Sequence, residues 1–325
     1  MVPRVIIGLA VVALIIASAF AWAVNAFNRP GPLTAEATVV IEQGDGLAAV
    51  ARRLADAGII SDPLLFRLGV RLLGDARGLR AGEYAFGPGA SMRSVVASLA
   101  AGRTLDRRLT IPEGLTSAAI VELINAAPAL SGTLHVVPAE GSLLPETYHY
   151  SYGDSRAELV ARMQEAMTRT VAELWPQRAA GLPLGTAQQA VILASIVEKE
   201  TGLAAERPRV AAVFINRLKR GMPLQADPTI AYGLALEGAA PGRPLTRADL
   251  ARRSPYNTYL QRGLPPGPIA NPGRASLEAV LNPADTDELY FVADGSGGHA
   301  FARTLEEHNR NVAKWRRKQT APAAP

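Results

Sequence analysis

The sequence predicts an α+β protein made of an N-terminal transmembrane helix, a small α/β module, and a larger mixed α/β domain with a central buried helix. Three observations lead to this prediction. Residues 5–24 form an apolar run without a charge. Residues 29–103 then alternate between strand-like and helix-like patterns. Finally, residues 188–201 begin as an almost uninterrupted apolar helix, which is typical of a helix surrounded by other protein.

Length and composition limit the possible classes of protein. A chain of 325 residues is long enough for two domains of ordinary size. The absence of cysteine excludes disulfides, thiolate metal sites and a cysteine nucleophile. The net charge of +5 favours an anionic partner, but it is modest for so long a chain. An envelope polymer, phospholipid and nucleic acid all stay open on this ground.

The N-terminal run has the length needed to span a bilayer as a helix. Arg4 lies on its short side and Trp22 lies where an interfacial aromatic is expected, so the positive-inside rule places the bulk of the chain outside. A cleaved signal peptide with Ala17-Ser18-Ala19 as its cleavage site is the alternative. We favour an uncleaved anchor over residues 1–28, because the apolar run continues past that site.

The module over residues 29–103 contains two expected strands, at 37–42 and 82–86. A helix with apolar residues at helical spacing follows the first strand, Pro63 can open a second helix, and Ser91 can cap a third. No acid is set against an apolar face in this module. We therefore expect it to bind or to act as a spacer rather than to catalyse.

The segment 104–154 is expected to connect the module to the larger domain. It contains a strand-like stretch at 104–111, a helix at 118–126, and two loops that carry Glu113 and Glu146. These carboxylates could line a cleft, or they could be ordinary turn residues in water, and composition favours the second interpretation.

The larger domain is expected over residues 155–318, followed by a disordered tail at 319–325. Its predicted elements are helices at 155–175, 188–201 and 207–220, a strand at 289–293 with a hairpin-like turn, and a last helix that starts at a capping box of Thr304 and Glu307.

The helix at 188–201 carries the main candidate for chemistry. At 100° per residue, Glu198 lies within about 20° of Val191 and continues an apolar face. Glu200 is rotated by about 200° from Glu198 and continues the line of Leu193, Ile196 and Val197 instead. Burial can raise the pKa of a glutamate from about 4.3 to about 6.5 for roughly 3 kcal/mol, which would make it a general acid. The pattern alone nevertheless favours ordinary last-turn carboxylates paired with neighbouring basic residues.

Polar and aromatic residues recur after this helix in a way that is unusual for a surface loop. Tyrosine rings can stack on sugars, while amides and hydroxyls bond to sugar hydroxyls. A polar loop with half-buried tyrosines explains the same pattern equally well. The candidate substrate-binding residues are Asn216, Gln225, Asp227, Thr229, Tyr232, Ser254, Tyr256, Asn257 and Thr258.

Several other chemistries lack a signature. The nucleophile-elbow, zinc-protease, phosphate-loop and dinucleotide motifs are missing, and the four histidines are dispersed singly. We therefore expect no metal and no cofactor. No nucleic-acid motif occurs either, so nucleic acid is not expected as a partner.

Long motifs make the sequence similar to the YceG-like, MltG-type endolytic murein transglycosylases. They include Ala194-Ser-Ile-Val-Glu-Lys-Glu-Thr-Gly202, Leu224-Gln-Ala-Asp-Pro-Thr229, Ser254-Pro-Tyr-Asn-Thr-Tyr259 and Gly263-Leu-Pro-Pro-Gly267. The similarity covers essentially everything after residue 33. One departure is Gly141-Ser-Leu-Leu-Pro145, which has aliphatic residues where aromatic ones are expected.

The resemblance implies a protein held in the bacterial cytoplasmic (inner) membrane by a single span, with a LysM-like module and a catalytic domain outside. It implies peptidoglycan glycan strands as substrate, a role in limiting strand length, and a partnership with penicillin-binding proteins. It also selects Glu198 as the catalytic acid, with Glu200 and Glu146 in supporting roles.

One acid suffices for such a reaction, since the 6-hydroxyl of N-acetylmuramic acid attacks its own C1. The first rival function is a hydrolytic muramidase that uses Glu198 and a second carboxylate such as Asp227. The second is a non-catalytic scaffold that binds the wall.

Overall fold

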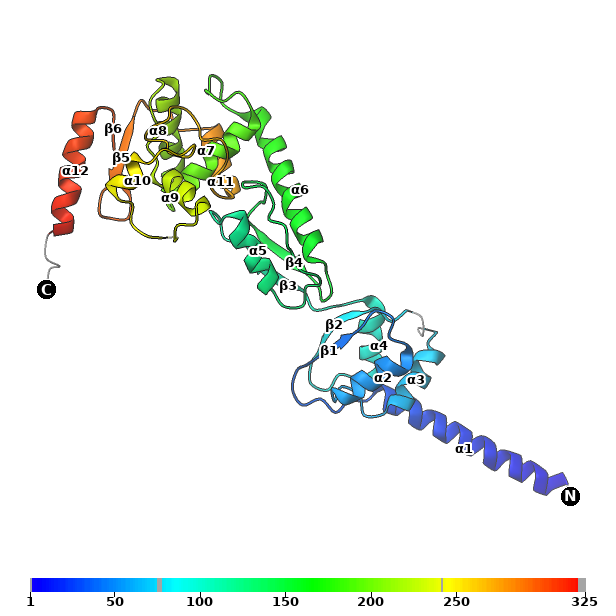
Figure 1. The fold of residues 1–325 in the computed structure, drawn as a ribbon. Helices are drawn as coiled ribbons and strands as arrows, with labels where there is room; N and C mark the ends of the chain where they lie inside the picture. The colour runs from blue at the N-terminus through cyan, green and yellow to red at the C-terminus, as the bar shows by residue number, and fades with distance from the viewer. Residues whose placement is uncertain (1, 75–77, 241, 321–325) are drawn as a thin grey trace. The chain divides into compact units, whose positions relative to one another are not determined.

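The computed structural model describes residues 2–74, 78–240 and 242–320, and its mixed α/β composition confirms the expected class (Figure 1). The chain forms two compact units. The first contains the described residues up to Arg108 together with Pro128–Ser131 and His149–Ser155, and the second contains the remainder. The segment 104–154, expected as a separate connection, is therefore divided between the two units.

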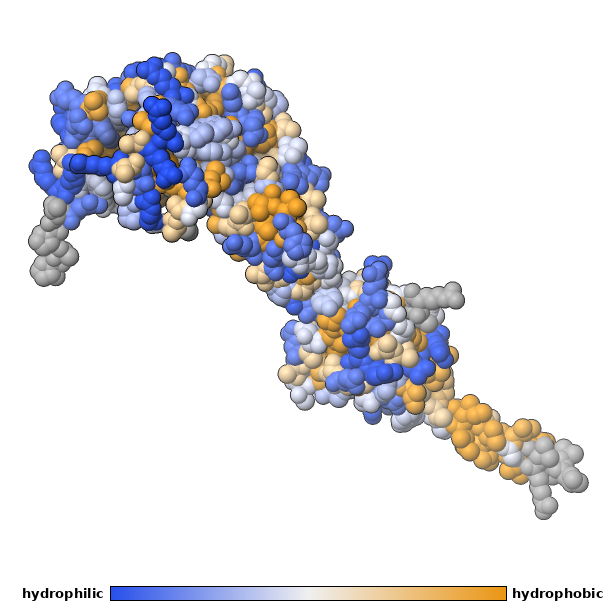
Figure 2. All heavy atoms as spheres, in the orientation of Figure 1, coloured by the Kyte–Doolittle hydropathy of each residue, from blue (hydrophilic) through white to orange (hydrophobic). Residues whose placement is uncertain are grey.

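The first unit begins with a long helix, α1 (Val2–Asn28). Its stretch from Ile6 to Asn28 is the one helix in the described part of the chain that is long and apolar enough to cross a membrane. In Figure 2 this helix is an almost continuous apolar rod. The expected N-terminal apolar helix is thus present, and it extends beyond the 5–24 run.

The module of the first unit is a two-stranded antiparallel sheet packed with three helices. Strand β1 (Ala37–Ile41) pairs with β2 (Gly82–Phe86), and Val39 lies opposite Tyr84. The helices are α2 (Leu47–Asp56), α3 (Pro63–Leu72) and α4 (Met92–Ala101). The predicted strands, helices and Ser91 cap are all confirmed, because local periodicity and capping residues agree throughout this segment.

The short strands β3 and β4 pair with each other, and each has residues assigned to both units. The other elements after α4 belong to the second unit. In chain order, the elements after α4 are β3 (Arg107–Thr110), α5 (Ser117–Ala126), β4 (Thr147–Tyr150), α6 (Arg156–Leu174), a 3₁₀ turn at Trp175–Gln177, α7 (Ala187–Glu200), α8 (Arg207–Lys219), α9 (Asp227–Leu236), α10 (Arg247–Ala251), α11 (Arg274–Leu281), β5 (Tyr290–Ala293), β6 (His299–Ala302) and α12 (Leu305–Thr320).

Helix α7 packs against α8 and α11, and every residue from 190 to 197 is buried. The hydroxyl of Ser195 donates to the carbonyl of Ile192 at 2.7 Å and accepts from the amide of Ile269 at 3.0 Å. A single buried side chain therefore fixes the proline-rich loop after residue 263 to α7.

Three helices of this unit, α9, α10 and α11, lie where the sequence predicts no helix. Helix α9 occupies part of the stretch whose recurring amides, hydroxyls and tyrosines indicate a polar loop. Pro228 lies in the first turn, where a proline is tolerated. Gly233 allows close packing, since a β-carbon there would lie 2.9 Å from the Ser254 hydroxyl. Helix α11 follows the proline-rich loop directly. The predicted tail overlaps the end of α12 by two residues, and positions 321–325 lie outside the described residues.

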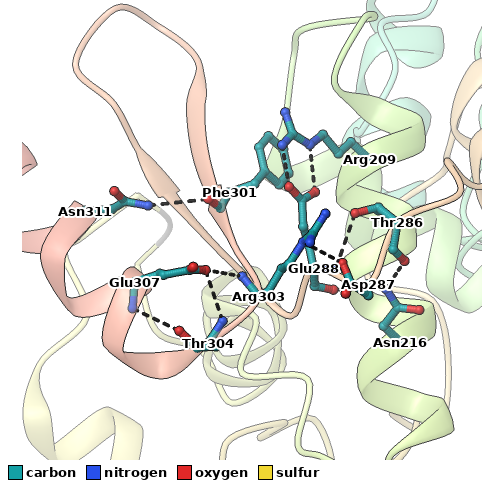
Figure 3. Close-up of polar contacts among 10 residues, drawn as sticks. All are labelled: Arg209, Asn216, Thr286, Asp287, Glu288, Phe301, Arg303, Thr304, Glu307 and Asn311. Carbon is teal, nitrogen blue, oxygen red and sulfur yellow. Dashed lines mark hydrogen bonds and ion pairs between the residues drawn. The ribbon is translucent and has the colours of Figure 1, made fainter.

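The hairpin of β5 and β6 is joined to α8 by polar contacts (Figure 3). Arg209 forms an ion pair with Glu288, and its guanidinium lies 4.1 Å from the centre of the Phe301 ring. Asn216 donates to the carbonyl oxygens of Thr286 at 2.7 Å and of Glu288 at 3.0 Å. These contacts position the start of β5 beside the candidate site.

Candidate active site

The candidate site lies at the C-terminal end of α7, where two glutamates are separated by one lysine. Thr186 caps the start of the helix by accepting from the amide of Gln189. Because two residues correspond to about 200° of helix rotation, the two carboxylates face different neighbours.

Glu198 is held by donors at both of its oxygens. Its Oε1 accepts from Arg207 Nη2 at 3.2 Å, and its Oε2 accepts from the backbone amide of Gly273 at 3.0 Å. Its side chain is only 5% exposed. Both carboxylate oxygens of Glu198 are therefore engaged in bonds to other segments of the chain.

A second carboxylate shares the same arginine. Glu113 accepts from Arg207 Nη2 at 3.1 Å, and burial raises the pKa of Glu113, with the nearby Glu198 charge adding to the effect. Lys199 donates to the carbonyl of Gly114 at 3.2 Å. We call the group of Glu113, Glu198, Lys199, Arg207 and Gly273 the clamp, because it ties two loops to the helix end.

A buried amide extends the clamp toward a third loop. Asn271 donates to the Leu115 carbonyl, the Ser117 hydroxyl and the Glu140 carboxylate, all at 3.0–3.1 Å. Its own oxygen accepts from the amide of Leu143 at 2.9 Å. Burial raises the pKa of Glu140. Sequence reasoning gave neither residue a role, since their meeting depends on contacts about 130 residues apart.

Glu200 has a different environment. Burial, reinforced by the charge of Asp227, raises the pKa of Glu200 to about 8, while Arg217 opposes the rise. None of the hydrogen bonds found among the described residues uses its carboxyl group. At neutral pH Glu200 therefore carries a proton that no described protein group is accepting.

Asp227 begins α9 beside Glu200 and is held by a tyrosine. The hydroxyl of Tyr259 donates to Asp227 Oδ1 at 2.6 Å. Burial raises the pKa of Tyr259, and the hydrogen bond to Asp227 raises it further. Tyr259 thus stays neutral and fixes the orientation of the exposed Asp227 carboxylate.

Arg217 supplies a buried cation near the same group. It donates to the backbone oxygens of Leu289 and Leu224, both at 2.7 Å, and lies 5.2 Å from the centre of the Tyr290 ring. Burial lowers its pKa, and nearby groups including Glu200 oppose that change. Arg217 lies four residues after Val213 and so continues the buried side of α8.

The loop before α9 contains a strained residue. Gln225 has a φ of 53°, in the left-handed region that residues other than glycine rarely adopt. Its amide donates to the Thr258 carbonyl at 3.0 Å, and its side-chain oxygen lies 3.4 Å from Arg217 Nη1. Such strain persists where surrounding contacts impose it, and it is frequent at functional sites.

Three of the expected substrate-binding residues are buried. Thr229 and Thr258 share a hydroxyl contact at 2.9 Å, and Thr258 also accepts from the Ala226 amide at 3.0 Å. Asn257 donates to the carbonyls of Leu250 and Arg252. Because these polar atoms serve internal bonds, the geometry argues against sugar contact and for a frame that joins α9 to the 254–259 turn.

The remaining expected residues divide into two groups. Tyr232 and Tyr256 are half-buried with ring centres 5.0 Å apart, Tyr232 donates to Glu140, and Ser254 accepts from the Tyr256 amide. Asn216, by contrast, gives its amide to the hairpin described above. Glu146 is exposed, and its carbonyl accepts from Ile111.

Together these features are those of an enzyme that uses acid–base catalysis: Glu200, a carboxylic acid with a raised pKa, lies near Asp227 and Arg217. The chain belongs to the YceG-like family, whose model matches residues 39–314. The family expected from the sequence motifs is therefore confirmed.

Known proteins of this family align over most of the chain. It is 31% identical to an endolytic murein transglycosylase of Bacillus subtilis (strain 168), over 93% of this chain and 91% of that protein. A protein of the same name from Streptococcus pneumoniae is 29% identical, over 85% of this chain and 58% of that protein. The crystal structure of a yceG-like protein from Listeria monocytogenes superposes with a TM-score of 0.52 at 31% identity, covering 85% of this chain and 98% of that one.

Proposed function

We propose that this chain is a membrane-anchored endolytic murein transglycosylase. It cleaves the bond between N-acetylmuramic acid and N-acetylglucosamine within glycan strands and leaves 1,6-anhydro ends. The feature that carries the proposal is Glu200 at the end of α7, because burial and the nearby Asp227 charge raise its pKa to about 8. The relatives from Bacillus subtilis and Streptococcus pneumoniae bear this activity in their names.

The reaction needs one group that first gives and then takes a proton. Glu200 donates its proton to the glycosidic oxygen, and the N-acetylglucosamine end leaves as an alcohol. The 6-hydroxyl of the same N-acetylmuramic acid attacks C1, closes the anhydro ring, and returns its proton to Glu200. The nucleophile is tethered to the substrate, so no bound water takes part. Arg217 stabilises the Glu200 carboxylate between the two transfers.

This assignment transfers the acid role from Glu198, which the resemblance had selected, to Glu200. Both oxygens of Glu198 already accept hydrogen bonds in the clamp. A general acid needs a proton at neutral pH, and burial together with the Asp227 charge raises the pKa of Glu200 to about 8. Glu198 instead positions the loops at residues 113–115 and 271–273.

The cellular setting is part of the same proposal. α1 anchors the chain in the bacterial cytoplasmic membrane and is not cleaved. The continuous helix through the alternative cleavage site at residues 17–19 supports this part of the proposal. The module outside the membrane binds glycan in the manner of a LysM domain. The enzyme limits the length of new strands near penicillin-binding proteins, as the family resemblance implies.

Product analysis of the purified full-length chain tests the reaction. Mass spectrometry of digested glycan strands should show anhydro ends, and Glu200→Gln should abolish them while leaving the fold intact by circular dichroism. Full strand cutting by Glu200→Gln would reject Glu200 as the acid. Wall binding without any cutting by the natural chain would instead support the scaffold function.

Hydrolysis is the second candidate function, because Asp227 lies close enough to raise the pKa of Glu200. A muramidase would use Asp227 as the second carboxylate and would release reducing ends that are heavier by one water than anhydro ends. The same mass spectrum therefore separates the two reactions.

A further inference from the structure

The outer face of α3 carries an exposed apolar stripe. Leu64, Leu68 and Leu72 are 70%, 53% and 70% exposed and follow one another at intervals of four residues, so they lie along one side of the helix. The next residue, Leu73, is also exposed. A soluble surface rarely groups its leucines in this way.

This stripe adjoins the end of α1. The ring of Phe27 packs so closely on Gly69 that a β-carbon there would lie 2.3 Å from it. An apolar groove of about 590 Å³ runs along the junction, and its walls come from α1 residues such as Phe20 and Val24 and from α3 residues such as Leu68 and Leu72. The apolar surface of α1 therefore continues without a break onto α3.

The charged side chains within α3 itself are both arginines. α3 contains Arg67 and Arg71 and no acid. Asp62, just before the helix, is occupied in capping it by accepting from the amides of Leu64 and Leu65. At the rim of the groove, Arg93 donates to Asn28 at 3.3 Å. An apolar face flanked by arginines is the pattern of a helix that lies in the interface of an anionic bilayer.

We propose that α3 is an interfacial helix, whose leucine stripe enters the outer leaflet of the membrane that α1 spans. The inference rests on the proposed anchoring by α1. A span of about 20 residues covers about 30 Å, so residues 5–24 would fill the hydrocarbon layer. The groove includes α1 positions 19–28, and this places α3 at the depth of the outer acyl chains and headgroups.

Lipid is a better occupant than a second protein chain because of this depth. One wall of the groove belongs to the spanning helix itself, so the open side faces acyl chains wherever α1 is inserted. The arginines next to the stripe match phosphate groups at the same level. The module is then held on the membrane surface by two elements instead of one.

The absence of cysteine makes the test direct. Leu68→Cys in the full-length chain is labelled with an environment-sensitive fluorophore and reconstituted in vesicles of phosphatidylglycerol and phosphatidylethanolamine. Ala85→Cys, exposed on β2 of the same module, is the matched control, and Val12→Cys in α1 reports insertion. We expect blue-shifted emission at position 68, and quenching by nitroxide-labelled lipids about fivefold stronger than at position 85.

Each result has a defined meaning. A label at position 68 that behaves like the one at position 85, while position 12 is quenched by lipid, overturns the interfacial helix and leaves the anchor intact. Failure of the position 12 label to insert overturns the anchor itself. A label at position 68 that is shielded from water but not quenched by lipid, with disulfide-linked dimers of Leu68→Cys, shows a second copy on the stripe and also overturns the proposal.

Discussion

Glu198 and Glu200 lie on the same helix turn, yet their surroundings differ in almost every respect. Glu198 meets Arg207 and the amide of Gly273, and both of its oxygens are used. Glu200 lies near Asp227 and near Arg217, whose guanidinium donates mainly to backbone oxygens. Neighbouring charges and hydrogen-bond partners, as well as burial, therefore distinguish two carboxyl groups on one helix turn.

The largest expected effect comes from Glu200→Gln. It removes the proton donor, so kcat/KM for strand cleavage should fall by roughly 10³-fold, within the range of general acid catalysis. Glu198→Gln is the matched control, because it changes the neighbouring acid in the same way. Its kcat/KM should fall by about tenfold at most, because the loops that the clamp holds become less well positioned. A larger loss in Glu198→Gln than in Glu200→Gln would reverse the comparison.

The same substitution should also change stability in a pH-dependent way. The pKa of Glu200 is raised to about 8 in the folded chain, so the folded state binds more protons than the unfolded state between pH 4.5 and 8. Glu200 therefore makes the natural chain lose stability as pH rises through that window. Glu200→Gln should gain a few degrees in Tm over the natural chain at pH 8 but not at pH 4.5, by calorimetry.

Asp227→Asn should shift the alkaline limb of the activity profile. In the proposed reaction activity needs protonated Glu200, so it should fall above the pKa of Glu200. The Asp227 charge raises that pKa, so its removal should lower the limb by roughly one pH unit. A pH series of kcat/KM measures the shift. If the alkaline limb does not move and activity is otherwise retained, the group that titrates in this limb is not Glu200.

Gly273→Ala tests the clamp without touching the Glu200 side. A β-carbon at this position would lie 1.8 Å from Glu113 Oε1, so the Glu113 side chain must leave Arg207. We expect a loss of about 1–2 kcal/mol in the free energy of unfolding, measured in urea. The pH profile should keep its alkaline limb. A shift of the alkaline limb would show that the clamp also affects the pKa of Glu200.

The smallest expected effect is that of Tyr259→Phe. It deletes the hydroxyl that donates to Asp227 at 2.6 Å while keeping the ring. Loss of one such bond costs about 1 kcal/mol, which corresponds to about a fivefold drop in kcat/KM. Steady-state kinetics at pH 7 should show it. A drop as large as that of Glu200→Gln would give Tyr259 a direct part in proton transfer.

Much of the first unit could be predicted from sequence because its signals are local. Pro63, Ser91 and Gly102 mark helix ends, and the strands have clear bounds. The second unit was less readable. α9 looked like a loop because Pro228 and Gly233 are loop residues in most contexts, and their helical role depends on packing against the 254–259 turn.

The choice between the two acids shows the same limit. Helix rotation placed Glu198 in line with Val191, and Glu200 in line with Leu193, Ile196 and Val197. All of these apolar residues are buried, so rotation alone does not distinguish the two acids. The raised pKa of Glu200 comes from Asp227 and from burial by segments later in the chain. The position of a residue around one helix does not show which residues from other segments pack against it.

The packing of Phe27 on Gly69 makes the folding of the module depend on the last turn of α1. Phe27 belongs to the core of the module although it lies in the last turn of α1. That core is therefore complete only once this turn has emerged and docked. A soluble version that starts at Arg29 would lose a buried ring worth about 1.5–3 kcal/mol. A version that starts a few residues before Phe27 would keep it.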